Sequence, residues 1–530
     1  MRKSIKAAAI VALGLALVAP SAAVAAADTG WTKSAKLYEI RTWAGQSQWG
    51  HENGSLDAAT LFHPSSIVEL PDGRLLVADT ENHLLRVVST DRVSAYGGLI
   101  VGESEPNVLI GAYHDDALDL AAFHLPAGLA TDAQGNIYVA DSGNHAVRKI
   151  SSDGKVSTLA GNGLIGSDDA KGKKATFHSP SDVAVDSKGN VYVADTLNHV
   201  IRKITPDGTV STLTAPSERV IEFAPNEAEE VGDYADGPIA RAKFNEPSAL
   251  VVDQKGNLYV SDRGNHRIRY IDFAAGTVST VAGGSPNGNG SSVYGNNEPY
   301  AEGGYADGAV ARAKFNAPEG LSLTADGELI VADSLNHAIR IIRDGQVSTL
   351  TGVPEESGSA DGVTGSAQFN RPSDVVILSD GRLAIADKAG HKIRVLQKYA
   401  KPATAPSGST IAVLLNGQAV TLDVPPLARS NAVMLPVRSL GNALGYEVDY
   451  DAESGTATLT KGNVQYAVAS GAKTVTKTVD GKKQSVSLNA PALHSQNRMY
   501  LPVRFFAEES GLDVQWDASA RTVVIRDPVF

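Results

Sequence analysis

Residues 137–148 read Ile-Tyr-Val-Ala-Asp-Ser-Gly-Asn-His-Ala-Val-Arg, and residues 191–202 repeat the arrangement as Val-Tyr-Val-Ala-Asp-Thr-Leu-Asn-His-Val-Ile-Arg. In six copies of this stretch, a His follows the Asp by four positions and an Arg follows it by seven. The repeated residues are Asp79, Asp141, Asp195, Asp262, Asp333 and Asp387, His83, His145, His199, His266, His337 and His391, and Arg86, Arg148, Arg202, Arg269, Arg340 and Arg394. The chain therefore contains six copies of one structural unit.

Each unit predicts four short strands. In the second unit a proline opens an alternating stretch, a Gly-Asn turn precedes the run 137–141, and the runs 146–150 and 156–159 follow, separated by an Asp-Gly turn. Short β-branched runs between such turns indicate an antiparallel meander. A meander of this size cannot bury both of its faces alone, so we expect the copies to pack face to face and to close radially.

The two ends of the array predict how the ring closes. The sixth unit stops at Leu396 after its third strand, whereas residues 38–45, before the first unit, resemble the fourth strand of the second unit at residues 157–161. We therefore expect the N-terminal strand to complete the last sheet.

The combination of Pro, Gly-Asn, Tyr-Val-Ala-Asp, Asn-His and Ile-Arg resembles NHL repeats over residues 36–397. The resemblance implies a six-bladed β-propeller. It also implies a family of mostly interaction modules, with some lyase and lactonase relatives on similar scaffolds.

Residues that recur in every unit are expected to be structural, because a single active site must break the symmetry of a ring. We expect the repeated Asp to cap the turn that follows it and to pair with the repeated Arg, and the His to fill that turn. Metal binding by the six His is disfavoured because they lie in six separate units.

The second residue after each opening proline differs between units, and the innermost strand is expected to line the channel. Two of these residues, Asp182 and Asp374, belong to the third and sixth units. Two carboxylates facing each other across the axis are candidate ligands for a hard cation such as calcium. The alternative is a pair of solvated acids beside backbone amides.

Long loops between units, at residues 99–120, 214–240 and 284–311, are expected on one face of the ring, where binding sites are commonly carried. The candidate ligand-binding residues on them are Tyr113, Tyr234 and Tyr305. An acidic cluster comprises Glu222, Glu227, Glu229, Glu230 and Asp233. One helical turn that buries a Phe explains the Ala-Asp-Gly turns at residues 235–237, 306–308 and 360–362.

Residues 1–25 combine three cations, an apolar run and small residues, which is typical of a secretory signal peptide. We expect no membrane span, because the apolar run is too short and none follows it. The chain has no cysteine and a net charge of −12, so disulfides are excluded and a nucleic-acid partner is disfavoured. These features suit a secreted or cell-wall-associated protein of a Gram-positive bacterium.

The predicted propeller spans residues 31–398, and residues 399–410 form a linker rich in Pro, Ala and Ser. Residues 411–530 are a duplication, because Leu435-Pro436-Val437-Arg438 recurs 66 positions later as Leu501-Pro502-Val503-Arg504. In each copy we expect a helix after the proline, a glycine at the helix end and alternating strands, hence a small α+β domain.

This second region resembles the copper amine oxidase N-terminal (stalk) domain of secreted bacterial proteins, but none of the oxidase core. A local copper site is disfavoured because the region has one His, His494, and no Cys. The expected role is adhesion or presentation at the envelope, with Arg438 and Arg504 in internal ion pairs.

These observations favour a monomeric, non-catalytic binding protein whose partner is an extracellular protein or a cell-wall glycan. No cofactor is expected beyond the candidate calcium. The alternative is an enzyme that resembles the propeller lyases and lactonases and uses a divalent cation at the channel mouth.

Overall fold

The computed structural model describes residues 30–33, 37–224, 227–284, 293–399, 411–429 and 432–530. The predicted signal peptide and nearly all of the predicted linker lie outside the described residues. Within the described residues, none of the helices has the length and apolar character needed to span a membrane.

Each repeat unit forms one antiparallel sheet, and the sheets are numbered 1 to 6 in repeat order. Sheet 2 shows the pattern, with β9 (Pro126–Thr131), β10 (Ile137–Asp141), β11 (Ala146–Ile150) and β12 (Val156–Gly161) paired as successive neighbours. Its second strand lies between the first and third, so all strands are joined by hairpins and the predicted meander is confirmed.

The other sheets repeat this order. Sheet 1 contains β3 (Pro64–Glu69), β4 (Leu75–Asp79), β5 (Leu84–Val88) and β6 (Arg92–Gly97); sheet 3 contains β13 (Pro180–Val185), β14 (Val191–Asp195), β15 (Val200–Ile204) and β16 (Val210–Thr212); sheet 4 contains β20 (Pro247–Val252), β21 (Leu258–Asp262), β22 (Arg267–Asp272) and β23 (Thr277–Ala282); sheet 5 contains β25 (Pro318–Leu323), β26 (Leu329–Asp333), β27 (Ala338–Arg343) and β28 (Gln346–Thr351); sheet 6 contains β30 (Pro372–Ile377), β31 (Leu383–Asp387) and β32 (Lys392–Lys398). The two-residue strands β2 (Gly54–Ser55), β19 (Gly237–Pro238), β24 (Gly308–Ala309) and β29 (Gly362–Val363) extend the outer edges of sheets 1, 4, 5 and 6.

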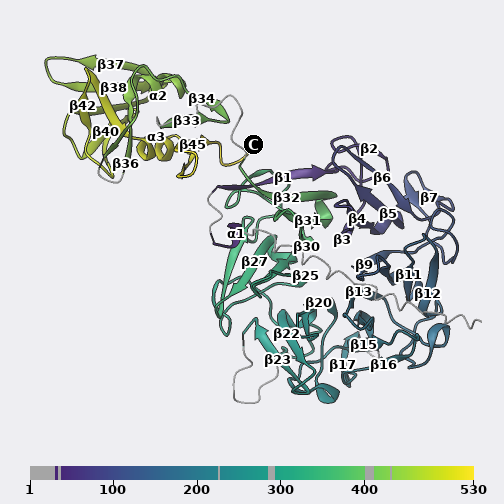
Figure 1. Cartoon of the computed structure of the whole chain (residues 1–530). Helices are drawn as coiled ribbons and strands as arrows, with labels where there is room; N and C mark the ends of the chain where they lie inside the picture. Colours follow the sequence, from purple (N-terminus) through teal and green to yellow (C-terminus); the bar gives the residue numbers. More distant parts are fainter. Residues whose placement is uncertain (1–29, 34–36, 225–226, 285–292, 400–410, 430–431) are drawn as a thin grey trace, which may run out of the picture.

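The sheets stand in a closed ring (Figure 1). The first strand of each sheet contacts the first strand of the next, and β30 of sheet 6 contacts β3 of sheet 1. The apolar core is divided into clusters between neighbouring sheets, as where Ala78 of sheet 1 meets Val139 of sheet 2. Because each sheet buries its faces against two neighbours, the ring is stable only when it is closed.

The ring closes through β1 (Tyr38–Ala44), the first strand of the ring. This strand pairs antiparallel with β32, with Tyr38 opposite Lys398 and Ile40 opposite Leu396. Ile40 is fully buried in the cluster between sheets 5 and 6. The sequence-based prediction that the N-terminal strand completes the last sheet is confirmed.

The described part of residues 411–530 contains three further sheets and two short helices. The first sheet contains β33 (Ala412–Leu415), β34 (Gln418–Ala419), β44 (Asp513–Asp517) and β45 (Thr522–Arg526); the second contains β35 (Leu427–Arg429), β36 (Ala432–Pro436), β42 (Leu493–Ser495) and β43 (Arg498–Pro502); the third contains β37 (Glu447–Asp451), β38 (Thr456–Lys461), β39 (Val464–Ala469), β40 (Thr474–Val479) and β41 (Lys482–Ser487). The helices are α2 (Val437–Ala443) and α3 (Val503–Glu509).

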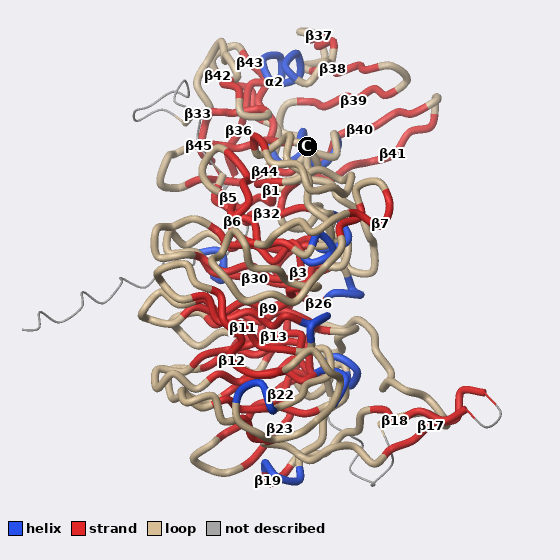
Figure 2. The backbone as a smooth tube through the Cα atoms, turned by 90° about the vertical axis from the view of Figure 1, so that its right-hand side faces the viewer, coloured by secondary structure: helices blue, strands red, loops and turns tan. Residues whose placement is uncertain are grey.

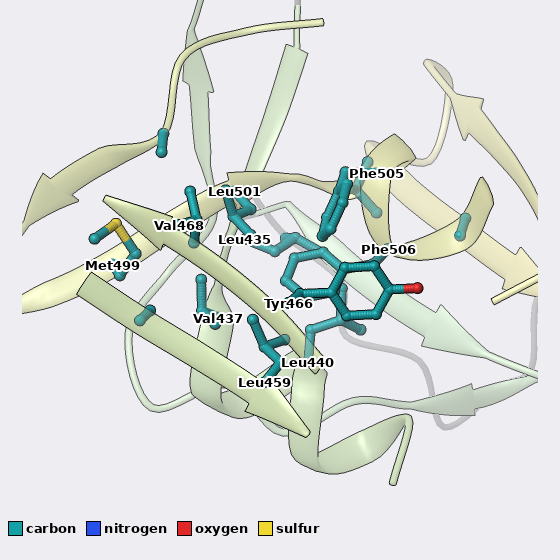
Figure 3. Packing of buried hydrophobic residues seen from close by; sticks show 14 of the residues in the cluster. Leu435, Val437, Leu440, Leu459, Tyr466, Val468, Met499, Leu501, Phe505 and Phe506 are labelled. Atoms are coloured by element: carbon teal, nitrogen blue, oxygen red, sulfur yellow. The ribbon is translucent and has the colours of Figure 1, made fainter. Parts of the chain in front are cut away.

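The local signals in this region are confirmed. Each helix follows its proline, and Gly445 and Gly511, with φ of 80° and 71°, stand just beyond the helix ends as expected of C-terminal glycines. The core gathers apolar side chains from both copies, including Leu435 and Leu501 from the paired strands β36 and β43 (Figure 3).

The C-terminal tail contacts the sheet that closes the ring. Val363 N donates to Pro528 O at 2.9 Å and Phe530 N donates to Asp361 O at 3.1 Å, so the tail lies beside β29 as a further edge segment. Arg526 donates to Glu39 of β1 at 3.3 Å, and Glu39 is only 3% exposed. No sequence pattern predicts this contact, because it joins residues 487 positions apart.

Candidate functional site

The repeated Asp and Arg form a buried ion pair in every sheet. In sheet 3, Arg202 donates to Asp195 Oδ2 at 2.7 Å, and both side chains are 0% exposed. Asp195 Oδ1 accepts a hydrogen bond from His178 N at 2.8 Å, just before the opening proline of the same unit. Each pair therefore ties the second and third strands of a sheet to the segment that enters it.

Every repeated Arg also has a second partner at the outer edge of its sheet. In sheet 3 this partner is Asp169, which accepts from Arg202 at 2.8 Å. The six outer partners are Asn53, Asp115, Asp169, Asp236, Asp307 and Asp361.

Two expectations about these residues need correction. The repeated Asp makes no side-chain hydrogen bond that caps the following turn. In sheet 3 the oxygens of Asp195 instead accept hydrogen bonds from Arg202, from the side chain of Asn198 and from the backbone amide of His178. The Ala-Asp-Gly turns do more than bury a Phe. Their acids Asp236, Asp307 and Asp361 are the outer partners of the buried Arg, although Phe244, Phe315 and Phe369 are indeed buried.

Burial raises the pKa of Asp195 to about 6, while the Arg202 guanidinium opposes that rise. Burial likewise raises the pKa of Asp333 and of Asp387 to about 6. These acids are therefore ionised at neutral pH and form charged pairs with their arginines. Such pairs are costly to break, because removal of one partner leaves the other charged and buried.

The repeated His fasten each sheet to the next. His266 of sheet 4 accepts a hydrogen bond at Nδ1 from Ala317 N of sheet 5 at 2.8 Å, and His391 of sheet 6 accepts one from His63 N of sheet 1 at 3.3 Å. The other four His accept from the corresponding amides. All six adopt left-handed backbone conformations in their turns, with φ between 48° and 58°. The prediction that they fill the turn is confirmed, and the bond between sheets is an addition.

We expect His266→Asn to change the pH dependence of stability. Burial lowers the pKa of His266 to about 4, below the 6.5 of an exposed His, so the neutral imidazole stabilises the fold above pH 6.5 and this contribution is lost as the pH falls toward 4. Asn tolerates the left-handed conformation and also offers an acceptor oxygen, but it does not titrate.

The free energy of unfolding, measured in urea at pH 7.5 and pH 5, should fall by about 2 kcal/mol more in the wild type than in His266→Asn. Identical pH dependence in the two proteins would show that His266 titrates alike in the folded and unfolded states.

The residue two positions after each opening proline lines one central cavity, as predicted. The cavity holds about 260 Å³ and its lining includes Ser66, Gly128, Asp182, Ala249, Gly320 and Asp374. The arrangement has a pseudo-twofold pattern, because Gly precedes Asp in sheets 2 and 3 and again in sheets 5 and 6. A Cβ on Gly128 would lie 2.2 Å from Asp182 Oδ1, so each carboxyl depends on the neighbouring glycine.

Both carboxyls face the cavity but are bound to the ring. Asp182 Oδ2 accepts from Leu250 N at 2.7 Å, and Asp374 Oδ2 accepts from Ser66 Oγ and Ile67 N, both at 2.9 Å. Each therefore ties its sheet to the next one. Burial raises the pKa of Asp374 to about 7, and burial together with the charge of Asp374 raises that of Asp182 well above its usual range. Among the described residues, no group of three or more His, Cys, Asp or Glu could hold a metal ion.

Tyr113, Tyr234 and Tyr305 occupy equivalent positions in three sheets. Their hydroxyls lie 2.8, 2.7 and 2.9 Å from Thr158, Thr280 and Thr349 of the fourth strands. The repeated Arg lies over each ring, at 5.0, 4.5 and 4.7 Å from the centroid. This recurrence is typical of a packing role. Each Tyr stands 35 positions before the repeated Arg that it contacts, a constant spacing that sequence reasoning missed because it treated the tyrosines as loop residues.

The loops that differ between sheets project from one side of the ring. Figure 2 shows β7 (Glu103–Glu105) and the hairpin of β17 (Arg219–Ala224) and β18 (Glu227–Val231) on the same side. The hairpin carries exposed Val220 and Phe223, 56% and 60% exposed, together with Glu222, Glu227, Glu229 and Glu230. Asp233, the fifth acid of the predicted cluster, pairs instead with Lys243 at 2.9 Å.

Arg219 anchors the base of the hairpin. Its guanidinium donates to Gly232 O, Glu298 O and Pro299 O, each at 2.7 Å, and lies 3.5 Å from the ring centroid of Tyr294. The hairpin is therefore presented at a fixed position beside the loop that precedes sheet 5.

Family models match both parts of the chain. The NHL repeat model matches residues 123–150, 177–204, 244–269, 315–342 and 369–396, and the model of the copper amine oxidase N-terminal domain matches residues 414–525. The unit that forms sheet 1 is outside these matches, although its Asp79 and Arg86 pair at 2.8 Å as in the other sheets.

Curated relatives carry similar sequences over part of their length. Protein SUPPRESSOR OF QUENCHING 1, chloroplastic, of Arabidopsis thaliana is 30% identical over 54% of this chain and 26% of its own. NHL repeat-containing protein 2 of Bos taurus is 28% identical over 77% of this chain and 57% of its own. The chain thus spans between a quarter and little more than half of these relatives.

Two solved structures show a distant likeness of fold. An auxiliary nutrient binding protein from Bacteroides thetaiotaomicron is 14% identical over 68% of this chain and 76% of its own, with a TM-score of 0.46. A gluconolactonase from Xanthomonas campestris is 15% identical over 69% and 92%, with a TM-score of 0.40. At these values the likeness has no bearing on function.

The paired Asp and Arg, the His bridges and the family models agree on the character of the repeats, and the second model covers the region beyond them. The chain therefore contains NHL repeats followed by a copper amine oxidase N-terminal domain.

Proposed function

We propose that the chain is a secreted, non-catalytic binding protein built on a six-bladed β-propeller. The loop face of the propeller recognises an extracellular protein or glycan, and the small α+β domain at residues 411–530 associates the protein with the cell envelope. The protein acts as a monomer outside the cell.

One observation carries this proposal. The ionisable side chains that recur around the ring, namely Asp, Arg and His, form ion pairs or hydrogen bonds within or between sheets. The three equivalent tyrosines are hydrogen-bonded as well. The irregular loop side therefore offers the surface most free to bind. On it, the β17–β18 hairpin presents exposed apolar and acidic side chains on an anchored base.

We expect the hairpin variant Val220→Ser, Phe223→Ser, Glu222→Gln to lose most capture of partners from extracellular and wall fractions, because apolar contacts at the centre of an interface carry most of its energy. The measurement is a quantitative pull-down with the full chain. The control carries the same number of substitutions away from the hairpin. It changes Asp72, Asp91 and Asp153, which lie at exposed turns of sheets 1 and 2, each to Asn or Ser. Equal capture by both variants would exclude this face.

The alternative, an enzyme with a divalent cation in the channel, is supported by the two carboxyls that face one cavity. Under our proposal calcium finds no site, because the carboxyl oxygens already accept bonds from Leu250, Ser66 and Ile67.

Calorimetric titration of calcium should therefore give no heat with the wild type or with Asp182→Asn. Stoichiometric heat in the wild type that disappears in Asp182→Asn would favour the alternative.

A further inference from the structure

The two copies in residues 411–530 are related by a local twofold axis. Strands β36 and β43 pair antiparallel with Leu435 opposite Leu501, and these two residues occupy the same position in the two copies, 66 residues apart. An antiparallel pair centred on equivalent residues places a twofold axis through that pair. Any feature that one copy builds together with its partner therefore has a counterpart across the axis.

Two surface grooves are related in this way. One lies at Tyr450 and the other at Trp516, which are equivalent aromatic residues, 39% and 43% exposed. Of the ten residues that line the groove at Tyr450, nine have their counterpart, 66 positions away, in the lining of the groove at Trp516. The tenth is Asn497, whose counterpart at position 431 lies outside the described residues. The grooves are thus one duplicated site.

The two grooves differ in what fills them. In the groove at Tyr450, the His494 ring stacks on Tyr450 with centroids 5.8 Å apart and planes at 21°, and Arg498 also lines this groove. The counterparts of His494 and Arg498 in the other groove are Ala428 and Ala432. The groove volumes differ accordingly, about 160 Å³ at Tyr450 and about 580 Å³ at Trp516. The first groove is filled by the chain's own side chains, whereas the second is open.

The charges of the two grooves differ as well. Asp449 in the groove at Tyr450 is replaced by Gln515, and Asp423, which pairs with Arg498 at 2.5 Å, is replaced by Asn489. The lining at Trp516 contains three arginines, Arg429, Arg504 and Arg521, and no carboxylate. The open groove has therefore gained cations and lost acids relative to its counterpart.

These arginines are available to a ligand. In the part of the chain that the structure describes, no carboxylate pairs with Arg429 or Arg521, and Arg504 meets only Glu508 at 3.9 Å on the exposed helix surface. Of the two arginines expected to pair internally, Arg504 does so with Glu508 of its own helix, whereas no ion pair of Arg438 is found among the described residues. Residues 411–530 contain eleven Lys and Arg and eleven Asp and Glu, so the net negative charge of the chain lies outside this region.

We propose that the groove at Trp516 binds an acidic saccharide, with a sugar ring stacked on the indole and its carboxylate held by the arginines. The ring takes the place that His494 occupies in the other groove, over a floor that includes Val514 and Val523. Aromatic faces offer broad apolar contact, and Arg binds carboxylates through paired hydrogen bonds. The volume is within the range of about 300–1,000 Å³ typical of small-molecule sites.

A nucleic-acid strand would also stack on an aromatic ring beside arginines. The sequence disfavours it, because the chain as a whole has a charge of −12 and the three arginines are gathered in one groove instead of along a track. The test below includes this competitor.

The experiment is calorimetric titration of the full chain with trigalacturonic acid, a neutral trisaccharide of equal length and a ten-residue thymidine oligonucleotide. We expect binding of the acidic trisaccharide only. The double variant Ala428→His, Ala432→Arg recreates the filling of the other groove and should weaken binding at least tenfold, as should Trp516→Ala. Arg504→Gln, on the exposed helix surface, should weaken it about fivefold.

The matched control is His494→Ala, Arg498→Ala, which empties the groove at Tyr450 and should leave the affinity of the Trp516 groove unchanged. Thermal unfolding checks that each variant is folded. No binding by the wild type, equal binding of the neutral trisaccharide, preference for the oligonucleotide, or undiminished binding by the folded filled variant would each overturn the proposal.

The inference rests on the proposed function in one respect, because the attachment of residues 411–530 to the envelope is the setting in which the groove meets its saccharide. Cosedimentation with purified cell walls separates the two. If wall binding persists in the filled variant, the saccharide site is not the attachment site. If the acidic trisaccharide binds but walls do not, the envelope role fails and the saccharide site stands.

Discussion

Deletion of residues 30–45 is expected to abolish cooperative folding of the ring. The deletion removes β1 from sheet 6 and with it two fully buried anchors, Ile40 and Trp31, whose indole Nε1 donates to Gly381 O at 2.7 Å. Loss of one such side chain costs about 2–5 kcal/mol, and the whole domain has only about 5–15 kcal/mol of stability. The exposed edge of β32 would also favour aggregation.

A circular permutant that keeps β1 but moves the N-terminus tests whether the strand itself, and not the position of the chain end, is needed for folding. Tyr38 lies opposite Lys398, so a two-residue Asn-Gly turn can join Lys398 to Tyr38 in a chain that begins at residue 46 and ends at residue 45. Compared with residues 30–398 in the natural order, this permutant should regain cooperative thermal unfolding, at a midpoint lowered by the absence of Trp31, while the deletion variant should not. Cooperative unfolding of the deletion variant would mean that β1 is dispensable.

The second large effect is expected for Asp195→Ala. This substitution leaves Arg202 charged and fully buried with only Asp169, which is 46% exposed, as its acidic partner. It also removes the acceptors of Asn198 and of His178 N. Breaking a buried pair from one side costs about 3–5 kcal/mol, measured as the free energy of unfolding in urea.

Asp169→Ala is the matched control because it removes the other carboxylate on the same arginine. Because the Asp169 side chain is partly exposed to solvent, we expect the free energy of unfolding to fall by only about 1 kcal/mol. If Asp195→Ala and Asp169→Ala destabilise the ring equally, the buried Asp195 carboxylate contributes no more to stability than the exposed one, and the recurrence of this Asp in every repeat has another cause.

The local parts of the fold could be predicted from spacing alone. The run at 137–141 and its counterparts become second strands because β-branched residues alternate with turn signals, and the glycines after α2 and α3 end those helices. The closure by β1 was also predictable, because residues 38–45 resemble a fourth strand and sheet 6 lacks one.

The partners of these residues across the structure could be predicted only in part. His266 reaches an amide 51 positions away but His145 reaches one 34 positions away, so no fixed spacing encodes these contacts between sheets. Arg269 reaches Asp236 across 33 positions, and every other repeated Arg has the same separation from its outer partner, so this contact does have a signal in the sequence. The position of Tyr113, Tyr234 and Tyr305 in variable loops is typical of ligand-binding residues, yet a repeated arginine lies over each ring.

The sequence by itself determined the six-fold recurrence of one sheet-forming unit, the strand that closes the ring and the duplication of residues 411–530, because each of these is a pattern within a few dozen residues or a repeat of such a pattern. Only the tertiary structure decided that the C-terminal tail lies beside β29, and that equivalent grooves at Tyr450 and Trp516 are filled and open. The physical reason is that packing volume and charge balance depend on side chains brought together from distant segments, as when Ala428 and Ala432 leave space that His494 and Arg498 occupy across the twofold axis.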